Sequence, residues 1–234
     1  MMLRPFTLGV QKFARSAYFF ACRMNLNNVV LNPTSDVRHL VLFGDGTPEN
    51  YVVAILAHHL NERKVIGIAK HQERTGLDTL TDVRTYFKAS KRLETLVLIT
   101  DRNKETLDAI TNSVKARLEK AGLEYELSDE GVVKIATLRY DEREADLIVL
   151  LNDFRLEGAK AFTIENHLLY IAIEVFGHEY VRELLDETRG DPKAAWRRLG
   201  KRKQAQVFRC MIEKREIIEQ VFPQHVRVLE LIDG

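Results

Sequence analysis

Acidic side chains follow three separate apolar segments of this sequence, and such side chains can bind metal ions. A hard cation such as Mg²⁺ prefers oxygen ligands, commonly one or two carboxylates together with water and substrate phosphate. Two such ions can stabilise both the attacking and the leaving oxygen of a phosphoryl displacement. The polar residues that follow the three segments are Asp45 with Glu49, Asp101 with Asn103, and Glu165. If these residues converge, the sequence predicts an acidic metal site.

The apolar segments have the length and the boundaries of buried strands, and the segments between them have the periodicity of helices. Thr47 is the predicted N-cap of the first helix, with Pro48 at its first position. Thr79 and Asp82 have the spacing of a capping box. The predicted strands are residues 39–43, 64–69, 93–100, 125–128, 132–138 and 145–151, and the predicted helices are 49–60, 78–88, 104–121, 164–176, 179–187, 193–199 and 204–222.

This alternation predicts an α/β fold, with a doubly wound, mostly parallel sheet and additional C-terminal helices. Ligands of such sheets bind at the carboxyl ends of the strands, which is where the acidic residues lie. The 234 residues suit one large domain or one domain with an appendage. We therefore expect an N-terminal extension over residues 1–37, the α/β domain over 38–172 and a basic helical region over 173–234.

The N-terminal residues allow three interpretations. Residues 1–23 contain four basic residues and no acidic residue, a composition that resembles an amphipathic targeting segment. We favour the simpler interpretation that they are a plain extension, or that the working protein begins at Met24.

Each acidic residue also has a purely structural interpretation. Asp45 before Gly46 can form a tight turn, and Asp101 can cap the helix that follows it. Glu49 and Glu165 lie in predicted first helical turns, where an acid is favourable by roughly 0.3–1 kcal/mol without any function. Their occurrence at matched strand ends is the observation that favours a shared site.

A basic segment follows the predicted α/β domain. Residues 189–215 contain ten basic and two acidic residues, so they carry +8 although the whole chain carries +1. Such a segment can bind phosphates with a strong dependence on salt, or it can be a solvated helix face. Trp196 and Phe208 are expected to be core residues rather than platforms for nucleic-acid bases. The predicted nucleic-acid-binding residues are Arg197, Arg198, Lys201, Arg202 and Lys203.

Several classes of protein are excluded by the composition. Two cysteines are too few for a disulfide scaffold and favour a reducing, cytoplasmic setting. No apolar run approaches the roughly 20 residues that a membrane span needs. There is no Cys/His spacing typical of zinc sites, no P-loop and no dinucleotide-binding glycine motif.

The acidic motifs resemble those of a known family. The motif D-G-x-x-E that begins at Asp45 resembles the Glu-Gly-x-x-Asp/Glu signature of toprim domains, and D-R-N at Asp101 resembles their Asp-x-Asp motif. The segment F-T-I-E-N-H-L-L, which contains Glu165, is similar to a segment of the toprim domains of OLD-type nucleases. The resemblance covers about residues 38–172, and its weight comes from the order and spacing of short motifs.

This resemblance implies Mg²⁺-dependent phosphodiester chemistry on nucleic acid, most simply as a nuclease, with Mn²⁺ as an alternative ion. Asp45 takes the place of a general acid/base glutamate, while Glu49, Asp101, Asn103 and Glu165 take the places of metal ligands. Two departures matter: Asp45 is one methylene shorter than glutamate, and Asn103 carries no charge. The alternatives are therefore a non-catalytic nucleic-acid-binding module and an α/β protein that binds a small nucleotide or a protein partner.

Overall fold

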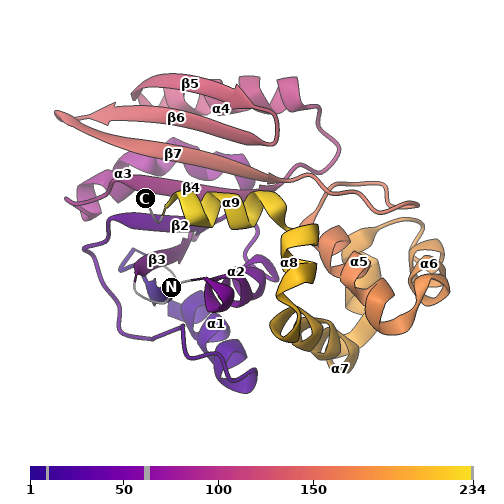
Figure 1. The fold of residues 1–234 in the computed structure, drawn as a ribbon. Helices are drawn as coiled ribbons and strands as arrows, with labels where there is room; N and C mark the ends of the chain where they lie inside the picture. Colours follow the sequence, from indigo (N-terminus) through magenta and orange to yellow (C-terminus); the bar gives the residue numbers. More distant parts are fainter. Residues whose placement is uncertain (9–10, 61–63, 233–234) are drawn as a thin grey trace.

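A single mixed sheet organises the protein. The computed structural model describes residues 1–8, 11–60 and 64–232; residues 9–10, 61–63 and 233–234 lie outside this description. Seven strands lie in the order β1-β3-β2-β4-β7-β6-β5 (Figure 1), and all neighbours from β1 to β7 are parallel, whereas β6 and β5 are antiparallel. The strands are β1 (Met2–Pro5), β2 (His39–Phe43), β3 (Val65–Lys70), β4 (Thr95–Asp101), β5 (Glu124–Glu130), β6 (Val133–Tyr140) and β7 (Arg143–Asn152). The predicted α/β class with a mostly parallel sheet is confirmed.

Helices cover both faces of this sheet because its central strands bury side chains on both sides. Val41 and Phe43 of β2 join one hydrophobic cluster, whereas Leu40 and Leu42 join the other. The first cluster includes side chains of α1 (Gln11–Arg23), α2 (Glu49–His59) and α9 (Pro223–Leu231). The second includes those of the 3-10 helix η1 (Gly76–Asp82), α3 (Val83–Ala89) and α4 (Leu107–Ala121).

The remaining helices gather beside the sheet rather than on it (Figure 1). They pack mainly against one another, and their apolar side chains belong to the first cluster. They are α5 (Ile164–Phe176), α6 (His178–Glu187), α7 (Pro192–Glu213) and α8 (Arg215–Val221).

The N-terminal residues, which the sequence presents as an extension, complete one edge of the sheet. Strand β1 pairs in parallel with β3, with Leu3 opposite Ile66. Helix α1 packs against α2, and the ring of Phe20 stacks on that of Tyr51 at a centroid distance of 4.2 Å. These contacts place β1 and α1 in the same hydrophobic core as the predicted α/β domain.

Two predicted helix caps are wrong. Pro48, not Thr47, occupies the N-cap position of α2, and its side chain makes no capping hydrogen bond. Backbone groups satisfy the first turn instead, because Asn50 N–H donates to the Gly46 carbonyl. Thr79 and Asp82 form no capping box either, since residues 76–82 form a 3-10 helix before α3 begins.

The C-terminal helices are more divided than their periodicity predicts. The expected break after residue 199 lies at Gly200, whose φ of 77° is non-helical. The predicted helix 204–222 is divided at Lys214, and α9, which the sequence analysis does not predict, follows it and packs against β7 and α2. No helix in the described part of the chain is long and apolar enough to cross a membrane.

Candidate metal centre

The turn that carries Asp45 is built from two glycines. A Cβ atom on Gly44 would lie 2.8 Å from Thr100 Oγ1, so only glycine allows β2 and β4 to approach here. Gly46 has a φ of 103°, which favours glycine, and a Cβ atom there would lie 2.8 Å from Lys70 Nζ. Lys70 donates a hydrogen bond to the Asp45 carbonyl. These contacts hold Asp45 at the carboxyl end of β2.

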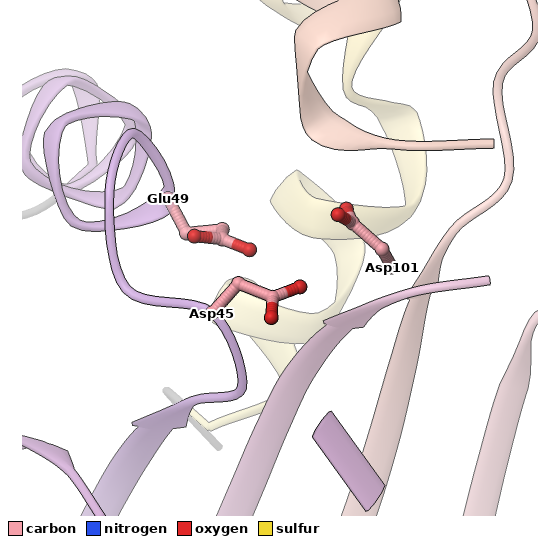
Figure 2. Close-up of side chains that lie close together, drawn as sticks. All are labelled: Asp45, Glu49 and Asp101. Atoms are coloured by element: carbon pink, nitrogen blue, oxygen red, sulfur yellow. The ribbon is translucent and has the colours of Figure 1, made fainter. Parts of the chain in front are cut away.

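Three carboxylates meet at the carboxyl ends of β2 and β4. One oxygen from each of Asp45, Glu49 and Asp101 lies within 4.8 Å of the other two. Figure 2 shows the three side chains facing a common space, from the turn after β2, the start of α2 and the end of β4. Glu49 and Asp101 are buried, and Asp45 is half-buried. Because β2 and β4 are adjacent parallel strands, their ends bring together residues 52 positions apart or more.

Glu49 is the least satisfied of these carboxylates. Both of its oxygens are buried and have no hydrogen-bond partner among the described residues. Its pKa lies well above the usual value, first because burial disfavours the charged form and then because Asp101 and Asp45 are negative neighbours. A buried carboxylate without partners is costly, and a cation between the three groups would remove that cost.

Asp101 is held in a fixed orientation by two neutral donors. Its Oδ1 accepts hydrogen bonds from Ile164 N and from Asn152 Nδ2, each at 2.9 Å. Asp101 therefore contacts the first residue of α5 instead of capping α4, whose N-cap is Thr106. Burial raises the pKa of Asp101, although Lys193 acts in the opposite direction.

Lys193 contacts the acidic group although the sequence did not single it out. Its ammonium nitrogen lies 2.7 Å from Asp101 Oδ2 and 3.6 Å from Asp45 Oδ2. Burial opposes its charge, but the ion pair with Asp101 and the charges of Asp45 and Glu165 prevail, so its pKa lies above the usual value. The sequence shows Lys193 only as one of many basic residues in 189–215. Its position follows from the docking of α7 against α2 and α5.

Glu165 lies beside the three-carboxylate group but is not part of it. It is the second residue of α5 and is buried, and its Oε2 has no hydrogen-bond partner among the described residues. Burial, and next the negative charge of Asp101, raise its pKa to about 7. The structure thus places Glu165 within electrostatic reach of Asp101 and Lys193.

Asn103 is positioned mainly by its backbone. It adopts a φ of 59° and exchanges two backbone hydrogen bonds with Phe162, with N···O distances of 2.8 and 2.7 Å. Its side chain is exposed, and its amide nitrogen is 3.5 Å from the Asp101 carbonyl oxygen. Asn103 therefore lies at the edge of the centre, where it can contact a ligand that enters from solvent.

Two hollows border the acidic group. One has a volume of about 380 Å³ and is lined by Glu165, Lys193 and Arg197, among others. The other, of about 190 Å³, includes Asp45, Asp101 and Asn103 in its lining. The smaller hollow therefore reaches Asp45 and Asp101, whereas the larger one reaches Glu165 and Lys193.

The basic residues of α7 differ in their surroundings. Arg198 pairs with Glu187 at 2.6 Å, and Lys203 donates to the Tyr180 hydroxyl at 2.6 Å while lying 3.9 Å from the centre of its ring. Arg197, Lys201 and Arg202 are exposed. As predicted, Trp196 and Phe208 are buried core residues.

The acidic group fits a metal ion. Its three ligand groups are all carboxylates, the donors that hard divalent cations prefer. The ammonium group of Lys193 lies against Asp45 and Asp101. A metal ion can therefore bind between the three carboxylates if this ammonium group moves aside.

No family model matches this sequence, and comparison with curated proteins and with solved structures finds no match. The resemblance to toprim domains therefore remains a prediction from the motifs and their spacing.

Proposed function

We propose that this protein is a Mg²⁺-dependent enzyme that cleaves phosphodiester bonds in nucleic acid, as toprim-type nucleases do. The observation that carries the proposal is the convergence of Asp45, Glu49 and Asp101, with both Glu49 oxygens buried and without partners among the residues that the structure describes. The exposed cations of α7, which begins at this site, support a polyanionic substrate.

Mg²⁺ is the ion that this donor set favours, with Mn²⁺ as a substitute. The described carboxylates offer oxygen ligands, whereas zinc sites in proteins commonly include histidine or cysteine. When bound, the ion would supply Lewis acidity at a phosphoryl oxygen and lower the pKa of bound water.

The protein residues then have separate tasks. Glu49 and Asp101, which are buried, would hold the ion, and Glu165 would add a further carboxylate at the wall of the larger hollow. Asp45, which is half-buried and borders the smaller hollow, accepts the proton of the attacking water. Arg197 lines the larger hollow, where its charge can hold a phosphate.

The test combines metal binding with cleavage. Calorimetric titration with Mn²⁺ and Mg²⁺, and cleavage of single- and double-stranded DNA and RNA, would be measured for wild type and Asp101→Asn. Asp146→Asn is the matched control, because Asp146 lies at the opposite end of the adjacent strand β7. We expect binding and cleavage in wild type and in the control but not in Asp101→Asn. Identical cleavage traces with and without Mg²⁺ would refute the catalytic proposal.

A second candidate function is non-catalytic binding of nucleic acid. The ion pair between Lys193 and Asp101 favours it, because an internal cation already neutralises part of the acidic group. This alternative predicts salt-dependent binding without turnover in electrophoretic shift assays. Binding would be lost when Arg197, Arg198, Lys201 and Arg202 are neutralised together.

A further inference from the structure

A chain of hydrogen bonds connects the last helix of the described chain to the acidic centre. The imidazole Nε2 of His225, on α9, lies 2.9 Å from Asn152 Oδ1, and Asn152 Nδ2 lies 2.9 Å from Asp101 Oδ1. Asn152 ends β7, and Asp101 ends the adjacent strand β4. Asn152 and His225 are 0% and 2% exposed, so water does not compete for these contacts.

The donors and acceptors in this chain can be assigned. The Asp101 carboxylate only accepts hydrogen bonds, so Asn152 must turn its NH₂ group toward it. The Asn152 carbonyl oxygen then faces His225 and needs a donor, so His225 carries its proton on Nε2. Burial lowers the pKa of His225 well below its usual value, consistent with a neutral ring that has one N–H.

These hydrogen bonds determine which oxygen of Asp101 faces Asp45 and Glu49. Oδ1 is occupied by Asn152 and by the backbone N–H of Ile164. Oδ2 is left to point at the Lys193 ammonium group, in the space that the three carboxylates share. Rotation of the carboxylate would break both bonds to Oδ1, and Asn152 is itself held by His225.

We infer that His225 is a positioning residue of the metal centre, which acts through Asn152 to fix the orientation of Asp101. This inference rests on the proposed metal-dependent function. It assigns α9 a role in the site although His225 follows Asp101 by more than 120 residues in the chain. Partners that hydrogen-bond directly to metal ligands, as Asn152 does to Asp101, typically contribute about 10–100-fold to metal affinity, and we expect His225 to act at the lower end of that range because it acts through Asn152.

A second buried histidine shows why packing alone does not explain this arrangement. The rings of His167 and His225 are 5.6 Å apart, with Phe222 against both. His167 is hydrogen-bonded to the backbone carbonyl of Val221, at 2.8 Å. This bond joins α5 to α8 and does not involve the acidic residues. Only His225 of this pair contacts the side chain that holds Asp101.

The experiment compares variants that separate the hydrogen bond from the packing. His225→Leu fills similar space without a donor, and His225→Gln retains an N–H group that can reach Asn152. Val228→Ala is the matched control, because Val228 is a buried residue of α9 that belongs to the apolar core. Mn²⁺ affinity would be measured by calorimetry, together with the free energy of unfolding in urea.

We expect His225→Leu to weaken Mn²⁺ binding by up to about 10-fold, and His225→Gln to restore much of that loss. Val228→Ala should lower stability and leave the affinity unchanged. In an Asn152→Leu background, His225→Leu should cause no further loss of affinity, because the connection is already broken.

A measurement on the wild type keeps the inference testable if His225→Leu does not fold. The Nε2–H resonance of His225 should shift on addition of Mg²⁺, and the ring resonances of His167 should shift less. Unchanged His225 resonances despite Mg²⁺ binding, or equal affinities of wild type and His225→Leu, would overturn the positioning role alone. A wild type that binds neither ion would overturn the proposed function and this inference with it.

Discussion

Two regions of the sheet bury ionisable side chains. One region supplies hydrogen-bond partners for them, and the other does not. In the β5–β6 hairpin, Lys134 is 1% exposed and pairs with Asp129, which also accepts hydrogen bonds from Thr111 Oγ1 at 2.7 Å and Gly131 N at 3.0 Å. The hydrogen bond from Lys134 is the main reason that the pKa of Asp129 lies below its usual value. At the ends of β2 and β4, by contrast, the pKa of Glu49 is raised and neither of its oxygens has a partner in the described structure.

This difference separates a structural ion pair from a candidate binding site. A buried charge whose partners are supplied by the fold contributes to a unique structure and needs nothing more. A buried carboxylate without partners raises the free energy of the folded protein unless a ligand completes it. The acidic centre should therefore respond to metal ions, and the hairpin pair should not.

The largest expected effect concerns Glu49. We expect Glu49→Gln to weaken Mn²⁺ binding by at least about 100-fold, since loss of a direct ligand should cost no less than loss of its hydrogen-bond partner. Without metal, the variant should be as stable as wild type or more stable, because one buried acid is neutralised. Calorimetry and urea unfolding test both statements. Unchanged affinity would exclude Glu49 as a ligand.

In the β5–β6 hairpin, by contrast, we expect removal of the acid to lower stability and to have no effect on metal binding. Asp129→Ala should destabilise the protein by about 2 kcal/mol, less than for a fully buried pair because Asp129 is partly exposed. The reason is that the ammonium group of Lys134 loses its partner. Glu124→Ala, at an exposed position of the same strand, is the control for urea unfolding. Added Mg²⁺ should not change this difference, and a metal-dependent cost would contradict the structural interpretation of the pair.

Lys193 tests whether an internal cation substitutes for the metal. Lys193→Met should strengthen Mn²⁺ binding by up to about 10-fold, the scale of a partly exposed ion pair, because no ammonium group has to leave Asp101. It should also destabilise the metal-free protein. Lys201→Met removes the same charge from an exposed position of α7 and is the matched control. Equal gains for the two variants would indicate a general effect of net charge.

The smallest expected effect is a dependence of stability on pH. The pKa of Glu165 rises from 4.5 to about 7 on folding, so between these values the folded protein retains a proton that the unfolded chain has lost. The stabilisation is complete below the lower value and is lost as the pH rises through about 7. Glu165→Gln imitates the protonated form. It should match wild type near pH 4.5 and be more stable than wild type at pH 8, by on the order of 1 kcal/mol. Parallel pH profiles of thermal unfolding would contradict this assignment.

Much of the fold follows from local sequence rules. The strands β2, β4 and β7 are continuous apolar runs, as strands buried on both faces must be, and their boundaries differ from the predicted ones by only a few residues. Gly122 directly follows the predicted helix 104–121 and ends α4 in a left-handed conformation with a φ of 64°. Edge strand β1 and helix α9 are not predicted. The strand that pairs with β1 and the elements against which α9 packs lie far away in the sequence.

The candidate site also contains residues whose proximity follows from the local sequence and residues that only tertiary packing brings near. Asp45 and Glu49 are four residues apart, across a glycine turn and one helix start, so their proximity is a local property of the chain. Asp101 joins them because adjacent parallel strands end at one edge of the sheet, which the alternation of strands and helices already indicates. Lys193 and His225 reach the centre only through the docking of α7 and α9, and that docking depends on apolar packing between distant segments. Residue types and backbone periodicity carry no information on such distances, so only the tertiary structure decides which cation and which histidine serve the acidic centre.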